Sequence, residues 1–229
     1  ADSLTGGGRN ETLLGGAGDD TLVGGAGTGD RVSFRATAAA VSVDLNTGVA
    51  VGEGTDVILN VEAIEGSDFA DTLLGGSGGD LFDGGRGSDI IAGGGGVDTA
   101  TWADASVNLV GNVAQGVVGD GVDYDIVSGV EVWRLGSGND IFVGWTGTRE
   151  VSLGAGNDWI ADYSSGNNDV FRGEAGNDAL YGLAGDDSLT GGDGADILIG
   201  GDGFDTLDGG HGFDWMQGGA GAETFLFSS

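Results

Sequence analysis

Residues 173–226 read GEAGNDALY, GLAGDDSLT, GGDGADILI, GGDGFDTLD, GGHGFDWMQ and GGAGAETFL, which are consecutive blocks of nine residues. The blocks share the template G-G-x-G-x-D-x-U-x, in which U is a large apolar residue. A fixed period of this kind is typical of a solenoid, in which each repeat is one small structural unit. The repeat therefore predicts the fold.

The template also fits earlier parts of the chain. It matches residues 15–23, 75–83, 84–92 and 93–101, although Ala100 replaces the large apolar residue in the last of these. Weaker copies lie at 135–143 and 153–161, with a degenerate copy between them and a looser one at 164–172. Most of the chain therefore follows one pattern.

Each position of the template has a physical reason. Adjacent glycines permit positive φ and close backbone approach, so the first six residues can turn tightly with several carbonyls pointing inward. The last three residues, x-U-x, suit a short strand in which only U faces inward. Two repeats then make one coil of a solenoid, and no repeat can bury its apolar side chain alone. Stability must come from stacking.

The composition indicates which ion and which partners suit this chain. It has 37 acidic and 7 basic side chains, a formal charge of −30, no cysteine and a single histidine. A chain this acidic repels itself unless cations lie among the carboxylates, and nucleic acid and anionic lipid are poor partners. Dense oxygen ligands without thiolates favour calcium and argue against zinc or copper. We therefore expect several Ca²⁺ ions.

These motifs resemble the RTX (repeats-in-toxin, haemolysin-type calcium-binding) family. The resemblance implies an all-β fold, a right-handed parallel β-roll stacked on calcium, with ions between repeats n and n+2. It pairs Asp178 with Asp196, Asp196 with Asp214, Asp187 with Asp205, and Asp205 with Glu223. Further implied pairs are Asp158/Asp178, Asp169/Asp187, Asp71/Asp89, Asp80/Asp98 and Asp140/Asp158.

The expected calcium ligands are therefore sixth-position acids and first-position glycines. The acids are Asp20, Asp71, Asp80, Asp89, Asp98, Asp140, Asp158, Asp169, Asp178, Asp187, Asp196, Asp205, Asp214 and Glu223. The glycines are Gly75, Gly84, Gly173, Gly182, Gly191, Gly200 and Gly209.

Three positions depart from the template. Arg149 stands in a sixth position, so we expect no calcium there and a guanidinium in place of the cation against Asp169. Glu223 is longer than aspartate. Asp20 has imperfect neighbours, Glu11 before it and Asp30 displaced after it by an inserted glycine. Calcium occupancy is therefore expected to be weaker at the two ends of the pattern.

Two inserts interrupt the repeats. We expect one elongated domain over residues 1–229, with repeats at 1–35, 66–101 and 135–229 and inserts at 36–65 and 102–134. Alternating residues predict longer strands in the inserts, at Val41, Val43 and Leu45 and at Val107 and Leu109. The favoured interpretation is that the inserts continue or cap the roll. The less favoured one is a cation site at Asp120, Asp123 and Asp125, whose spacing fits no EF-hand.

Successive strands belong to opposite sheets, so the outward residues of every second strand share one outer face of the roll. One face carries Trp159, Tyr181, Ile197 and Trp215, whereas the other is mostly polar. An apolar stripe of this size is rarely left exposed. We expect it to pack against the inserts, another domain or a second protomer, with stacking of a glycan as the alternative.

No motif indicates catalysis in this chain. The stretch 75–79 is a literal G-x-S-x-G, but Ser77 is the variable third residue of a repeat and His211 occupies the same slot in another. One histidine cannot supply H-E-x-x-H. The prominent carboxylates already have a role as calcium ligands. We expect no enzyme activity.

The resemblance also implies the function. Such repeats are calcium-induced folding modules of proteins exported by type I secretion, whose machinery would be a transient partner, and the location would be extracellular or at the cell surface. The N-terminus shows no signal peptide, no apolar run spans a membrane, and the pattern suggests a piece of a longer protein. The alternative is an adhesion or carbohydrate-binding module, as in alginate epimerases, adhesins or surface-layer proteins; a weaker one is the tail of a secreted protease or lipase.

Overall fold

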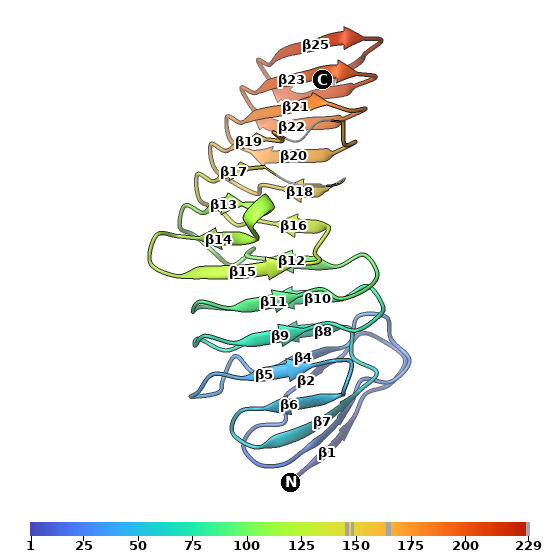
Figure 1. Ribbon diagram of the computed structural model, residues 1–229, viewed down its shortest axis with the longest axis vertical. Helices are drawn as coiled ribbons and strands as arrows, with labels where there is room; N and C mark the ends of the chain where they lie inside the picture. The colour runs from blue at the N-terminus through green and yellow to red at the C-terminus, as the bar shows by residue number, and fades with distance from the viewer. Residues whose placement is uncertain (145–146, 148, 164–165, 228–229) are drawn as a thin grey trace. The chain divides into compact units, whose positions relative to one another are not determined.

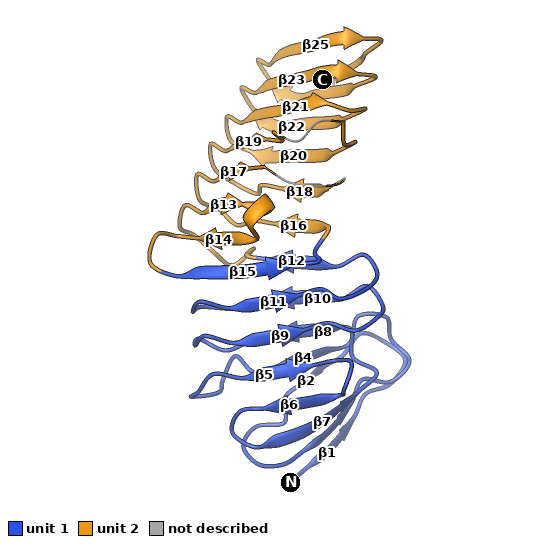
Figure 2. Cartoon of the chain, in the orientation of Figure 1, with its two compact units in different colours: residues 1–101, 123–130 blue, residues 102–122, 131–229 orange. Residues whose placement is uncertain are grey.

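The computed structural model describes residues 1–144, 147, 149–163 and 166–227. These residues form parallel β-solenoid coils, in which each coil places one strand in each of two sheets (Figure 1). The chain divides into two compact units, residues 1–101 with 123–130 and residues 102–122 with 131–229 (Figure 2). The expectation of an all-β parallel roll is confirmed, and that of one domain stays a prediction.

The first unit contains two sheets. One has the order β1-β3-β7-β6-β5-β9-β11-β15 and the other β2-β4-β8-β10-β12. The strands of the first sheet are β1 (Ser3–Thr5), β3 (Thr21–Val23), β5 (Ser42–Asp44), β6 (Val49–Val51), β7 (Thr55–Leu59), β9 (Thr72–Leu74), β11 (Ile90–Ala92) and β15 (Tyr124–Ser128). Those of the second are β2 (Thr12–Leu13), β4 (Arg31–Ser33), β8 (Ala63–Glu65), β10 (Leu81–Asp83) and β12 (Thr99–Thr101).

The second unit repeats this plan with orders β14-β13-β17-β19-β21-β23-β25 and β16-β18-β20-β22-β24-β26. Its first sheet comprises β13 (Val110–Asn112), β14 (Val117–Gly119), β17 (Ile141–Val143), β19 (Trp159–Ala161), β21 (Ala179–Ala184), β23 (Ile197–Gly203) and β25 (Trp215–Gly221). Its second comprises β16 (Val132–Arg134), β18 (Glu150–Ser152), β20 (Val170–Ala175), β22 (Ser188–Gly194), β24 (Thr206–Gly212) and β26 (Thr224–Leu226). A 3₁₀ turn, η1 (Val113–Gln115), joins β13 to β14.

The core consists of the U positions. Leu180, Leu189, Leu198 and Leu207 are 0% exposed, and the residues that flank them on each strand are not fully buried. Strand pairing sets these leucines in line: Leu180 pairs with Leu198, and Leu189 with Leu207. At β26, which is the last strand of its sheet, the U residue Phe225 is 40% exposed because no further strand covers it.

Strands in the most regular repeats extend beyond x-U-x. In β20 to β25 the pairing continues through the glycine loop, as in Glu174 with Gly192 and Gly201 with Gly219. The second loop position is left-handed there, and Glu174 and Leu183 adopt φ values of 74° and 72° without being glycine. Regular stacking therefore orders the loops as well as the strands.

The inserts contain antiparallel hairpins, which the prediction of longer strands did not include. Residues 42–59 form antiparallel pairs, β5 with β6 and β6 with β7, and β13 pairs antiparallel with β14. Val41 and Val43 are buried as expected, but Val107 is 48% exposed and precedes β13. The backbone near Val107 runs instead against the loop of a neighbouring coil, where the main-chain N–H of Ser137 donates to the carbonyl of Ala105. The inserts thus add hairpins to a sheet, in which β6 runs antiparallel to β5 and β7, and β14 runs antiparallel to β13.

The apolar outward residues of alternate repeats lie in one sheet, as the sequence predicts. Trp159 pairs with Ala179 and Ile197 with Trp215 in one sheet. Among the described residues this face stays open, because Trp215 is 54% and Ile197 38% exposed. The inserts do not cover these two side chains. What packs on this face stays a prediction.

Candidate metal-binding edges

The sixth-position acids form ladders along the edges of the coils. In each step the backbone N–H of one acid donates to the carboxylate Oδ1 of the acid two repeats later, as from Asp178 to Asp196 at 2.8 Å. The same bond joins Asp71 to Asp89, Asp80 to Asp98, Asp140 to Asp158, Asp158 to Asp178, Asp169 to Asp187, Asp187 to Asp205 and Asp196 to Asp214. The structure therefore brings together the pairs that the n and n+2 rule predicts, with Asp205/Glu223 as the exception discussed below.

The second oxygen of many of these carboxylates is buried without a hydrogen bond. Among the described residues this holds for Oδ2 of Asp20, Asp30, Asp89, Asp140, Asp158, Asp178, Asp187, Asp196 and Asp205, and for Oε1 of Glu223. A buried carboxylate oxygen without a partner costs several kcal/mol unless it is neutralised. The recurrence of the same orphaned atom at successive steps indicates a row of cation-binding positions.

First-position glycines face these same oxygens. A Cβ on Gly191 would collide with the Asp196 carboxylate and with the carbonyl oxygen of Gly209 in the next loop of that edge. The predicted glycines all lie in this way against the acid of their own loop: Gly75 and Asp80, Gly84 and Asp89, Gly173 and Asp178, Gly182 and Asp187, Gly191 and Asp196, Gly200 and Asp205, and Gly209 and Asp214. Glycine is needed there because carboxylate and carbonyl oxygens share the space that a side chain would fill.

The electrostatics of the ladders disfavour ionised carboxylates without a cation. Burial is the main cause that raises the pKa of Asp89 to about 8 and those of Asp158 and Asp169 to about 7. Burial likewise raises the pKa values of Asp178 and Asp187 to about 6. Neighbouring acids add to each shift, and the backbone N–H that each carboxylate accepts opposes it. At neutral pH these sites need a proton or a positive ion.

The donor set suits calcium. Among the described residues no group of three or more acidic or histidine side chains is arranged to hold a metal by itself, so an ion must also take main-chain oxygens. The loops supply such oxygens, since carbonyls of Gly209 and Gly191 lie beside the acids of adjacent loops. Calcium accepts six to eight ligands of mixed carboxylate and carbonyl type in flexible geometry. The residues present therefore fit calcium.

In two predicted ligands the second carboxylate oxygen, Oδ2, has a hydrogen-bond partner as well. Both carboxylate oxygens of Asp71 accept bonds from Ser67, and Oδ2 of Asp80 accepts the backbone N–H of Gly76 at 2.6 Å. Ser67 stands where the template has its second glycine. Asp71 and Asp80 thus lack the orphaned oxygen that acids such as Asp178 and Asp196 have, and their role as ligands stays a prediction.

The last step of the C-terminal ladders is looser than those before it. Asp214 is half-buried, and the negative charge of Glu223 contributes to the raised pKa of Asp205, after burial as the main cause. The longer side chain of Glu223 places its carbons against Gly218, where other loops place an Asp carboxylate. This geometry agrees with weaker occupancy at Glu223, which stays a prediction.

Acids in the inserts join the ladders, and sequence reasoning missed two of them. Asp20 donates its N–H to Asp56, and Asp89 donates to Asp125 at 2.9 Å. Asp125 was part of the proposed separate cation cluster, but the structure places it in the row of Asp71 and Asp89. Both acids fit the D-x-U-x half of the template, and this signal is easily overlooked because the glycines that precede it do not have the G-G-x-G-x-D spacing.

Asp20 and Asp30 belong to different ladders. Asp30 is 0% exposed, accepts the N–H of Glu11 and donates its own to Glu62, whereas Asp20 lies between Asp2 and Asp56. The inserted glycine therefore does not remove Asp30 from the pattern, because the loop accommodates it.

Arg149 occupies its sixth position as a backbone donor. Its N–H donates to Oδ1 of Asp169 at 2.8 Å, as an aspartate would. Its side chain lies along its own loop, with Nη1 3.6 Å from the place of a Cβ on Gly147. The repeats at 144–152 and 164–172 include Trp145, Thr146, Thr148, Ser164 and Ser165, which lie outside the described residues. The expected absence of calcium beside Arg149 stays a prediction.

The outer face and the last coil offer apolar surface. The ring of Trp159 lies 5.8 Å from that of Tyr181 and 6.4 Å from that of Tyr163.

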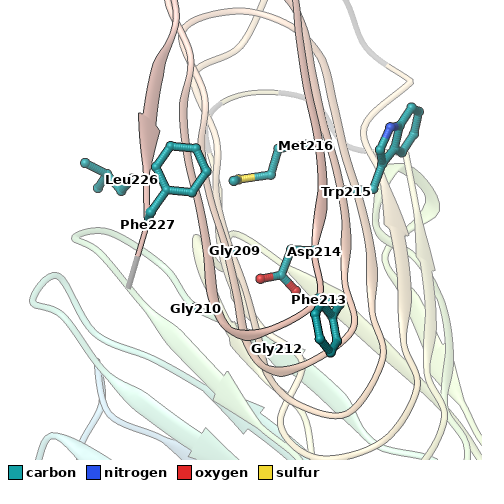
Figure 3. Close-up of a pocket in the computed structure, with 9 residues that line it drawn as sticks. All are labelled: Gly209, Gly210, Gly212, Phe213, Asp214, Trp215, Met216, Leu226 and Phe227. Carbon is teal, nitrogen blue, oxygen red and sulfur yellow. The ribbon is translucent and has the colours of Figure 1, made fainter. Parts of the chain in front are cut away.

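A hollow of about 390 Å³ lies at the last coil, where Met216 extends between the strands towards Phe227 and the ring of Trp215 points away from the hollow (Figure 3). Asp214 is the one titratable residue of its lining, which also comprises Gly209, Gly210, Gly212, Phe213 and Leu226. This lining contains no nucleophile paired with a base.

A glycine substitution tests the packing of the edge. Gly191→Ala is expected to lower the free energy of unfolding in saturating calcium by about 1–3 kcal/mol, because the methyl group displaces the Asp196 carboxylate. Thermal unfolding followed by circular dichroism measures this. Gly78→Ala is the matched control, since a Cβ there meets nothing within 4 Å. Equal effects of the two changes would contradict the proposed crowding.

Comparison with known families agrees with this geometry. The model of the RTX calcium-binding nonapeptide repeat matches in four copies, at residues 1–28, 65–100, 163–198 and 199–227, which together cover more than half of the chain. No curated protein matches the chain significantly. Within the described residues, no helix has the length and apolar character that crossing a bilayer requires.

Proposed function

Because the chain belongs to the RTX calcium-binding nonapeptide repeat family, we propose that this calcium-binding β-roll is a calcium-induced folding module of a protein exported by type I secretion. It acts outside the cell or at its surface and has no catalytic activity of its own. The observation that carries the proposal is the row of buried carboxylate oxygens without partners along the coil edges.

The ladders link calcium binding to folding. Each step combines an acid of one coil with an acid and carbonyls of the next coil, so the complete ligand set exists only when the coils are stacked. A ligand that binds only the folded state stabilises it by mass action. Calcium is therefore the signal that converts the extended chain into the roll.

The same property serves export. In a cytosol poor in calcium, a chain with a formal charge of −30 and 53 glycines stays extended and can pass through a channel. The sequence contains no cysteine and no proline, so neither disulfide formation nor slow prolyl isomerisation delays folding on the other side. Calcium outside the cell then supplies the folding free energy.

Titration calorimetry of the chelator-treated chain tests this function. We expect several calcium ions to bind with a large enthalpy of coupled folding, and the β signal in circular dichroism to grow over the same calcium range. Magnesium at equal ionic strength is the control, because its strict octahedral geometry and tightly held waters suit these loops poorly. Calcium binding without any gain of β structure would contradict a folding role.

A further inference from the structure

A second ladder of hydrogen bonds runs along one edge of the coils in the second unit. The backbone N–H of Asn157 donates to Oδ1 of Asn139 at 2.7 Å, and that of Asn177 donates to Oδ1 of Asn157 at 2.8 Å. The N–H of Asn139 likewise donates to Asn108, and that of Ala195 to Asn177, both at 2.9 Å. Four successive steps therefore form an asparagine ladder along this edge.

The asparagine ladder runs in the opposite direction to the acid ladder beside it. In the acid ladder, the N–H of Asp140 donates to Asp158, which belongs to the later coil. In the asparagine ladder, the N–H of Asn157 donates to Asn139, which belongs to the earlier coil. Two bonds in opposite directions thus join these neighbouring loops from adjacent positions. A slip of one residue would break both bonds and turn the U side chains out of the core.

The asparagine ladder needs no ion. An amide oxygen is a neutral acceptor, so it takes a backbone N–H without a cation or a proton nearby. Asn139, Asn157 and Asn177 are exposed, and no charge is buried when their side chains bond. In contrast, Oδ2 of Asp140 and of Asp158 is buried without a hydrogen bond. One edge therefore carries a ladder that needs cations beside one that does not.

Elsewhere in the described part of the chain, fifth-position side chains make shorter runs of such bonds. On the other edge of the second unit, Asn168 and Asp186 accept two successive steps at 2.9 Å. In the first unit, Asp19 and Ser88 each accept a single step, at 2.9 and 3.0 Å. The longest run of ion-independent bonds between coils therefore lies between Asn108 and Ala195.

We propose that the asparagine ladder is a calcium-independent device that sets the register of the coils between Asn108 and Ala195, so that these coils stack first when calcium is added. Asparagine suits this role because its short side chain readily bonds to the backbone. The stability of a solenoid is approximately a sum of terms for each repeat and for each contact between neighbours. Folding therefore starts at the interfaces that carry an additional bond in the absence of ions.

Calcium then completes what the asparagine ladder begins. Once two coils are in register, their acids and carbonyls lie in place for an ion, and the next coil can be added. The asparagine ladder alone does not replace calcium, because the buried carboxylates beside it still need a cation. This inference rests on the proposed calcium-induced folding and specifies the order in which the coils fold.

Hydrogen exchange followed by mass spectrometry tests this order in the full chain at increasing calcium. We expect residues 132–143 and 170–184 to gain protection at lower calcium than residues 72–101. Asn139→Ala combined with Asn157→Ala removes two steps and is expected to speed exchange in residues 150–161 about tenfold at a fixed calcium concentration. Phe204→Ala is the matched control, because it removes a fifth-position side chain that accepts no hydrogen bond. It should leave exchange in residues 150–161 unchanged.

The possible results separate this inference from the proposed function. If calcium protects no segment, the proposed function itself fails. If residues 72–101 gain protection first or together with the second unit, or if the double variant exchanges like Phe204→Ala, only the asparagine ladder fails. Asn157→Asp keeps the acceptor oxygen, as Asp186 does for the N–H of Phe204, and should preserve the order of protection. Should the double variant not fold, the order in the unchanged chain and in Asn157→Asp decides.

Discussion

Removal of calcium with excess chelator at neutral pH is expected to abolish most of the β-sheet signal of this chain, and added calcium is expected to restore it. A single site saturated a hundredfold above its Kd stabilises the folded state by about 2.7 kcal/mol. Several such sites together exceed the net stability of a typical domain, about 5–15 kcal/mol. Far-UV circular dichroism with and without chelator measures the change.

Sodium chloride separates specific binding from screening of charge. High salt weakens repulsion between exposed acids but reaches buried ones much less. We therefore expect salt alone to leave the chelator-treated chain largely unfolded, although its formal charge is −30. A chain that keeps its β signal in chelator at low salt would show that leucine packing suffices, and the proposed folding switch would then be wrong.

The repeat made the regular part of the fold predictable. Because the side chains of a strand alternate, a nine-residue period fixes which residue of x-U-x faces inward, and Leu180 and Leu198 lie where the template places them. The n and n+2 rule likewise places Asp178 beside Asp196. Both predictions depend on local geometry that each repeat copies from the one before it.

The inserts were less predictable because they lack that period. Alternation of apolar residues indicates a strand but not its direction or its partner. The sequence around Val107 therefore suggested a strand, whereas β13 begins at Val110 and pairs antiparallel with β14. Asp56 and Asp125 enter the ladders from the inserts, where the full G-G-x-G-x-D turn of the template is absent.

Acidification without calcium is expected to restore part of the fold. Protons can replace cations on the buried acids: burial raises the pKa of Asp89 to about 8, those of Asp158 and Asp169 to about 7, and those of Asp178 and Asp187 to about 6. In the unfolded chain these groups titrate near 3.9. Between about pH 4 and 8 the folded state therefore binds more protons than the unfolded state, and its stability falls as pH rises.

The measurement is circular dichroism in chelator at pH 5 and pH 7.5, with gel filtration to exclude aggregates because the isoelectric point is about 4.1. We expect more β structure at pH 5. In calcium we expect the reverse, with folding favoured at pH 7.5 over pH 5, because the ion must displace the same protons. The calcium concentration at which half of the chain is folded should therefore rise on acidification. The β content should therefore change with pH in opposite directions with and without calcium. This result is expected only if the same carboxylates bind protons and calcium ions. A chelator-treated chain equally unfolded at both pH values would show that the ladder acids do not control folding.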